Sequence, residues 1–136
     1  MTLELTSKEF RRLLDMVYIG NWILNSARGS DRFADYDNLQ EKLFALCRRE
    51  GMETLADVIY GRALPSRAYE EGGIHEAIAD YEDAVFFDIL AEELARRDMQ
   101  AEGLSQEDEA EVNRRVEEYF DEFEQHGIDN LRVETA

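Results

Sequence analysis

Asp88 and Glu92, two carboxylates one helical turn apart, are the residues of this sequence whose types and spacing come nearest to a reaction site. They lie in YEDAVFFDILAEELARRD, residues 81–98, among large apolar side chains. Two carboxylates at this spacing on one helix face can share a cation, or hold a raised pKa because like charges disfavour joint ionisation. We therefore take Asp88 and Glu92 as candidate metal ligands.

Ion pairing is the competing interpretation of the same acids. Arg96 follows Glu92 by four residues, and Arg97 follows Glu93 by four, which is the favourable order for helix ion pairs worth about 0.3–0.5 kcal/mol each. Carboxylates in folded proteins are mostly solvated or paired. We favour a solvated, ion-paired helix face and keep the metal site as the alternative.

Histidine and cysteine offer little further chemistry. His75 and His126 are the only histidines, and neither has a Glu three residues before it, as the Glu-x-x-His pairs of di-iron bundles require. We expect His126 to cap a helix C-terminus, where the helix dipole favours a cation. Cys47, on an apolar stripe without a nearby His, is expected to be a packing residue.

Two acid pairs have the spacing of a metal-dependent helical hydrolase. Glu50 and Glu53 are followed by Asp80 and Asp83, superficially like the paired acids that hold magnesium in helical nucleotide pyrophosphatases. Gly51 interrupts the first pair at an expected helix end, so these two side chains need not share a face. With 32 acids in 136 residues, such pairs also arise by chance. We therefore predict no catalytic residue and no cofactor.

Residues 81–98 also carry a short family resemblance. An aromatic residue, an acidic pair and a Phe are followed by Leu94-Ala95-x-Arg97-Asp98. This pattern resembles a signature of small acidic helical bacterial proteins and covers 18 of the 136 residues. The resemblance implies a bacterial cytoplasmic origin and a helical fold, and it implies no activity or site residue.

The elements that would position these residues are helices. Thr6 and Glu9 form a capping box before the first, and Ser105 is expected to cap the last. Apolar spacing predicts helices over 7–28, 35–51, 53–60, 74–99 and 105–126. We expect an all-α fold, a compact bundle or array of about five helices in a single domain over residues 1–136. The alternating segments TLELT and NLRVE predict a short two-stranded pairing of the chain termini.

The fourth helix is expected to form the core of this fold. Its apolar side chains fall on nearly opposite faces, and Phe86 and Ile89 cover a third direction, so its middle is apolar almost all round. The last helix has one apolar stripe and acids on the rest of its surface, which is typical of a helix that packs through one face and exposes the other to solvent.

Charge sets limits on the partners. The net charge is −17, and residues 69–136 carry all of it, with 22 acids against five arginines, while residues 1–68 are neutral. Such a field repels nucleic acid and anionic lipid and attracts basic proteins or cations. The single Cys and the absence of a secretory signal favour the cytoplasm, and the longest apolar window, residues 16–24, is too short to cross a bilayer.

These observations favour a non-catalytic, acidic cytoplasmic interaction or regulatory protein with a basic protein partner. One alternative is a DNA mimic that inhibits a nucleic-acid-binding protein, since rows of acids imitate phosphates. The other is a metal-dependent helical hydrolase using Asp88 and Glu92. A monomer and a homodimer are both compatible with the sequence, because the apolar coverage of the fourth helix and Trp22 would permit a dimer.

Overall fold

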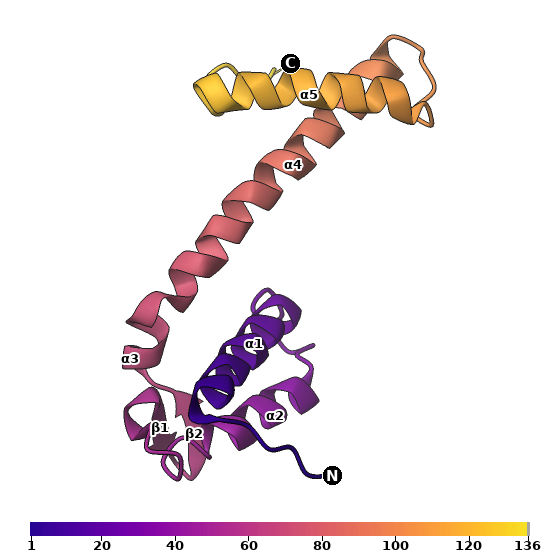
Figure 1. Ribbon diagram of the computed structural model, residues 1–136. Helices are drawn as coiled ribbons and strands as arrows, with labels where there is room; N and C mark the ends of the chain where they lie inside the picture. The colour runs from indigo at the N-terminus through magenta and orange to yellow at the C-terminus, as the bar shows by residue number, and fades with distance from the viewer. Residues whose placement is uncertain (136) are drawn as a thin grey trace. The chain divides into compact units, whose positions relative to one another are not determined.

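A computed structural model describes residues 1–135 of the chain (Figure 1). The chain divides into two compact units, Met1–Ile78 and the residues from Ala79 onward. The single domain expected from the chain length stays a prediction, which unfolding followed by two probes would test.

Helices dominate both units, as predicted. Within residues 1–135, four helices are longer than one turn, where about five were expected: α1 (Ser7–Asn25), α2 (Ala34–Phe44), α4 (His75–Ala101) and α5 (Glu109–His126). Between α2 and α4 lie a 3₁₀ turn (Glu53–Leu55), β1 (Ala56–Ile59), β2 (Arg62–Pro65), the single-turn α3 (Arg67–Tyr69) and a π-helical turn (Glu70–Ile74). No helix within residues 1–135 is long and apolar enough to span a membrane.

The capping box begins α1 as predicted. The Thr6 hydroxyl accepts a hydrogen bond from the Glu9 backbone N–H, and the Glu9 carboxylate accepts one from the Thr6 N–H, both at 3.1 Å. These bonds satisfy two of the donors that a helix start leaves free. The helix ends at Asn25 rather than at residue 28, where Arg28 instead donates its Nε to the carbonyl of Leu24 at 2.8 Å.

The second helix is shorter than predicted. It ends at Phe44, and a series of turns over 45–51 leads to Gly51, whose φ of 73° lies in the left-handed region that glycine adopts without strain. Asp35 and Asp37 lie in its first turn, where carboxylates favour the positive end of the helix dipole. The C-terminal end of α2 and the turns after it lie against the hairpin.

A β-hairpin replaces the third helix predicted over 53–60. The strands β1 and β2 are antiparallel with Ile59 opposite Arg62. The two turn residues, Tyr60 and Gly61, have φ of 51° and 76°, the left-handed values of a type I′ turn. The spacing of apolar residues fits a helix here, but adjacent β-branched Val58 and Ile59 directly before a glycine turn favour a strand.

The predicted pairing of the chain termini is wrong. Within residues 1–135 the only sheet is the hairpin β1–β2, and neither TLELT nor NLRVE forms a strand. The two alternating segments are not joined by a turn, so nothing local fixes the register in which they would pair. Alternation of apolar and polar residues alone is not enough to form a sheet.

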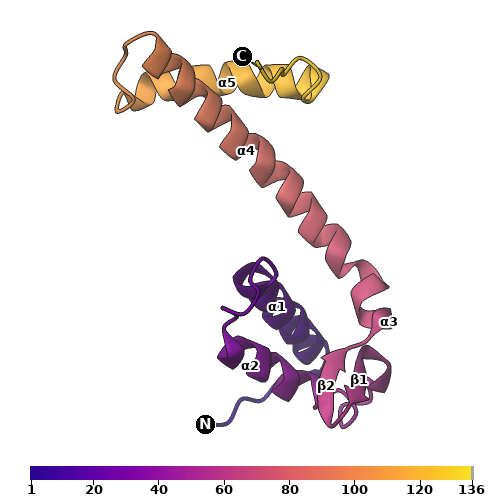
Figure 2. The same cartoon turned by 180° about the vertical axis from the view of Figure 1, so that it is seen from behind.

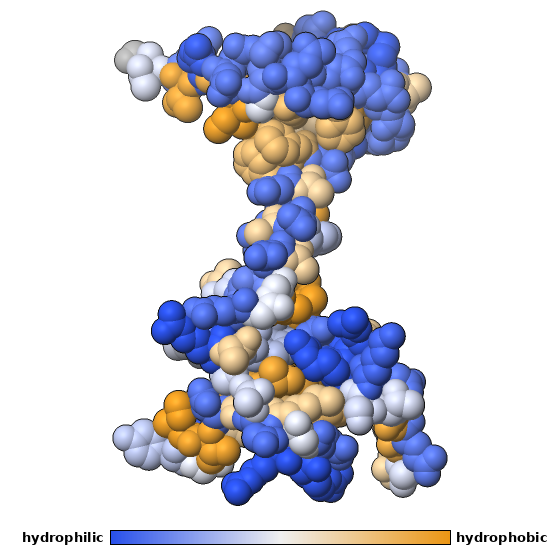
Figure 3. Space-filling view, turned by 60° about the vertical axis from the view of Figure 1, so that its left-hand side comes forward, coloured by the Kyte–Doolittle hydropathy of each residue, from blue (hydrophilic) through white to orange (hydrophobic). Residues whose placement is uncertain are grey.

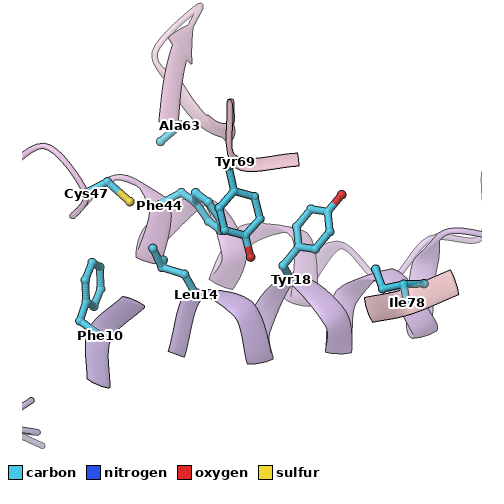
Figure 4. Close-up of a cluster of buried hydrophobic side chains, with 8 residues drawn as sticks. All are labelled: Phe10, Leu14, Tyr18, Phe44, Cys47, Ala63, Tyr69 and Ile78. Carbon is cyan, nitrogen blue, oxygen red and sulfur yellow. The ribbon is translucent and has the colours of Figure 1, made fainter. Parts of the chain in front are cut away.

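The core of the first unit lies between α1, α2, the hairpin and α3 (Figure 4). Tyr69 is at its centre, with its ring edge-on to Phe44 at 5.0 Å and to Tyr18 at 5.2 Å between centroids. Its hydroxyl donates to the Asp15 carboxylate at 2.8 Å, so the polar end of a buried ring is satisfied. The buried members are Phe10, Leu14, Tyr18, Phe44, Cys47, Ala63, Tyr69 and Ile78.

The second unit packs the C-terminal half of α4 against α5 (Figure 2). Ala91, Leu94 and Phe123 are buried in this contact. Between the two helices, Gly103 takes a φ of 74° and closes the end of α4. The Asp108 carboxylate then accepts from a backbone N–H in the first turn of α5. This helix therefore begins at Glu109, four residues after the predicted cap.

The expectation that the middle of α4 forms the core is wrong. Tyr81, Phe86 and Ile89 are 61%, 50% and 57% exposed. The surface of this part of α4 mixes hydrophilic blue with hydrophobic tan and orange (Figure 3). The apolar stripe that changes sides along the helix serves the contact with α5 only from Phe87 onward. Before it, Ile78 is buried in the core of the first unit, and Tyr81 faces solvent.

Candidate functional site

The candidate metal ligands Asp88 and Glu92 are both exposed on α4. Glu92 accepts two hydrogen bonds from the Arg96 guanidinium, at 2.9 and 3.1 Å, which confirms the predicted ion pair. Asp88 has no Lys, Arg or His nitrogen within 4.0 Å among residues 1–135. Across the same residues, no group of three or more His, Cys, Asp or Glu side chains could hold a metal ion. The two acids as a metal site stay a prediction.

Arg96 joins α4 to the start of α5. Besides Glu92, its guanidinium donates to the carbonyl of Gln106 at 2.5 Å and to the carboxylate of Glu109 at 3.2 Å. The hydrogen bonds that Arg96 donates to Glu92 and then to Glu109 raise its pKa. The second predicted pair, from Glu93 to Arg97, does not form, because Arg97 donates instead to its neighbour Asp98 at 2.8 Å.

One surface of α4 combines apolar and acidic side chains, and we call it the α4 face: Tyr81, Val85, Phe86 and Ile89. At 100° per residue, Tyr81, Val85 and Ile89 advance by 40° at each step, and Phe86 lies 60° beyond Ile89. Three of the four are more than one third exposed, and Val85 is half-buried. Single exposed apolar residues are ordinary in soluble proteins, but adjacent ones mark a contact surface.

Unpaired carboxylates surround the α4 face. From His75 to Ala95 the helix has seven acids and no Lys or Arg. Glu92 pairs with Arg96, but within residues 1–135 no cationic side chain lies within 4.0 Å of the remaining acids near the face. These are Asp80, Glu82, Asp83, Asp88 and Glu93. Glu82 falls between the directions of Ile89 and Phe86, so at least one free charge lies on the face itself.

The arginines of the second unit are committed elsewhere. On α5, Glu111 accepts hydrogen bonds from Arg114 at 2.7 Å and from Arg115 at 2.8 Å, and Arg115 also pairs with Glu102. The bonds from Arg114 and then Arg115 lower the pKa of Glu111 to about 2. From residue 79 onward the chain has 19 acids against five arginines, a net charge of −14. Little positive charge is therefore left near the α4 face.

A polar pocket of about 630 Å³ opens beside α1 in the first unit. Tyr18 and Trp22 in its wall also contact His75: the Tyr18 hydroxyl and the His75 Nε2 are 2.7 Å apart, and the Trp22 ring is edge-on to His75 at 4.8 Å. Burial, with a smaller effect of Glu70, raises the pKa of Tyr18 to about 12. No local pattern relates His75 to Tyr18, which lies 57 residues away, so sequence reasoning could not find this contact.

Asn21, in the wall of this pocket, and Asn25, behind it on α1, belong to one hydrogen-bond network. Asn25 is 1% exposed and holds Phe33 by both backbone groups, accepting from its N–H at 2.7 Å and donating to its carbonyl at 3.1 Å. Asn21 donates to the carboxylate of Asp37 at 3.0 Å, and Arg32 binds the same carboxylate through two nitrogens. In residues 1–135 no buried side-chain N or O atom lacks a hydrogen-bond partner. This network fixes the loop between α1 and α2, and it leaves no buried polar group free for a ligand.

The remaining candidate residues have structural surroundings. His126 lies in the last turn of α5, as predicted, with its Nδ1 3.1 Å from the Glu122 carboxylate. Cys47 is fully buried in the first core, and burial raises the pKa of its thiol, which keeps it protonated at neutral pH. Glu50 and Glu53, on the turns after α2, are exposed.

No family model, no curated protein and no solved structure matches this chain. On the α4 face, contacts within its own unit account neither for the exposed apolar area nor for the free charge.

Proposed function

We propose that this chain is a non-catalytic, bacterial cytoplasmic interaction protein whose α4 face binds a basic protein partner. The observation that carries the proposal is the exposure of Tyr81, Phe86 and Ile89 on one helix surface surrounded by unpaired carboxylates. A helix with apolar anchors at such spacing is a common mode of recognition, in which it lies in a groove of the partner. The single buried Cys and the lack of a disulfide support the cytoplasm.

The energetics require both parts of the face. Burying three side chains that are already half-buried contributes roughly 1 kcal/mol each. Association costs at least about 4 kcal/mol of translational and rotational free energy, so the apolar contact alone gives no useful affinity. Charge complementarity must add to it. A partner with Lys or Arg around an apolar groove supplies this, and its association rate falls as salt rises.

Crosslinking at the face identifies the partner. A photoreactive phenylalanine analogue replaces Phe86 in the full chain, and in a second protein it replaces Ile128, which is 54% exposed on the same unit outside the face. Both are irradiated in lysate of the source organism. We expect one basic protein to be captured stoichiometrically through position 86 and not through position 128.

Titration of that purified protein then tests the face. Phe86→Ser with Ile89→Ser and, separately, Glu82→Lys with Asp88→Lys should each weaken binding at least tenfold, while Ile128→Ser leaves it unchanged. All these positions are exposed, so the fold should persist, and far-UV circular dichroism confirms it. Capture of no protein, or binding that neither pair of substitutions changes, overturns the proposal.

A further inference from the structure

A shallow groove lies between α2, the turns after it and the β-hairpin. Two adjoining hollows of about 400 and 490 Å³ share Ala45, Arg48 and Val58 in their walls. Val58 is 71% exposed although it lies opposite Ala63, which is buried in the core. The groove therefore has an exposed apolar wall on the hairpin side and an exposed Ala45 on the other. We call it the α2 groove.

The α2 groove holds cations without partners. Seven of the ten Lys and Arg side chains of the first unit lie within 4.0 Å of a carboxylate. Within residues 1–135 the three that do not are Lys8, Lys42 and Arg48, and the last two both line the groove. Its acids are Glu41, which pairs with Arg62, and Glu53. Two free cations beside an exposed apolar wall favour an acidic segment with apolar side chains.

The chain itself contains a segment of that chemistry. The α4 face presents Tyr81, Phe86 and Ile89 with free carboxylates at Glu82 and Asp88, and it has no cation of its own between His75 and Ala95. Both surfaces have exposed apolar side chains, and their unpaired charges are of opposite sign. Every copy carries both surfaces.

We propose that the α4 face of one copy docks in the α2 groove of a second copy. This inference rests on the proposed function, because it assigns an occupant to the same face. In the proposed assembly, two copies exchange two equivalent contacts, each face in the groove of the other copy, which makes a closed two-fold dimer. Self-association covers the face, so a basic partner must compete with the dimer. The monomer is then the form that binds.

Charge reversal in trans tests the contact by sedimentation equilibrium. One variant carries Lys42→Glu and Arg48→Glu, and the other carries Glu82→Lys and Asp88→Lys. Wild type should be in monomer–dimer equilibrium, and each variant alone should dimerise at least tenfold more weakly. An equimolar mixture should recover dimers, since each basic face then meets an acidic groove and each acidic face a basic groove.

Matched substitutions control for net charge. Lys8→Glu reverses the third unpaired cation of the first unit outside the groove, and Glu117→Lys reverses an exposed acid on α5; neither should change the dimer dissociation constant. A wild type that is monomeric at 100 µM, reversals that leave dimerisation unchanged, or a mixture that does not recover dimers each overturn the proposal. Rescue only when all four reversals are on the same chain also overturns it.

The crosslinked partner separates this inference from the proposed function. Lys42→Glu with Arg48→Glu leaves the α4 face intact and should bind that partner as tightly as wild type or more tightly, because the competing dimer is lost. If wild type is monomeric while Glu82→Lys with Asp88→Lys still weakens partner binding, only the dimer is wrong. If dimers form as described and partner binding ignores the face, only the proposed function is wrong.

Discussion

Removing the buried Asn25 amide should destabilise the first unit. The side chain is 1% exposed and makes three hydrogen bonds, two to the backbone of Phe33 and one, at 2.6 Å, to the side-chain Oδ1 of Asn21. A neutral hydrogen bond contributes about 0.5–1.5 kcal/mol, and partners left buried lose their solvation as well. Asn25→Ala should therefore lower the free energy of unfolding by about 2–4 kcal/mol.

Urea unfolding followed by tryptophan fluorescence measures this loss. Trp22 is the only tryptophan and lies on the same helix, three residues from Asn25, so its emission reports the first unit. Asn38→Ala, at an exposed amide on α2, is the matched control and should cost less than about 0.5 kcal/mol. If Asn25→Ala is as stable as the control, the Asn25 amide does not hold the loop between α1 and α2, and the reasoning is refuted.

Two further outcomes follow from the charged side chains. Because the folded-state pKa of Glu111 is depressed from 4.5 to about 2, its ion pairs stabilise the fold above pH 4.5 and are lost as the pH falls from 4.5 towards 2. Glu111→Gln should therefore melt lower than wild type at pH 7 and lose less on acidification, whereas Glu117→Gln follows wild type. Mg²⁺, Ca²⁺ and Zn²⁺ at matched ionic strength should shift the melting temperature of wild type and of Asp88→Asn equally; a saturable shift from one ion, lost in Asp88→Asn, would instead make Asp88 and Glu92 a metal site.

Local signals in this sequence were read correctly where one residue type controls one nearby backbone group. Thr6 and Glu9 begin α1 as a capping box, and Glu92 pairs with Arg96 across one helical turn. Both depend on contacts three or four residues apart. The hairpin was missed because its turn is Tyr60-Gly61 rather than Asn-Gly, the stronger signal for a type I′ turn.

Contacts between distant residues could not be found in the same way. His75 meets Tyr18 and Trp22 only because α4 starts where the hairpin and α3 return the chain to α1. Lys42 and Arg48 are unremarkable in the sequence, and only the position of β1 beside them makes a groove. A single sequence shows which side chains are cationic, but it does not show which of them have no carboxylate as an ion-pair partner.

The middle of α4 shows why apolar periodicity and burial are different properties. Helical spacing shows which side chains point in the same direction. The apolar side chains of α4 point in several directions, which predicts a helix buried on all sides within the fold. The same pattern is equally typical of a helix that packs on one partner at its C-terminal half and exposes the rest. Charge separates the two cases, because a helix covered on all sides would have to bury Glu82 and Asp88 without a cation, at a cost of several kcal/mol per charge. Those carboxylates require either water or a basic surface opposite them. We propose a basic surface because the neighbouring aromatic and aliphatic side chains are exposed as well.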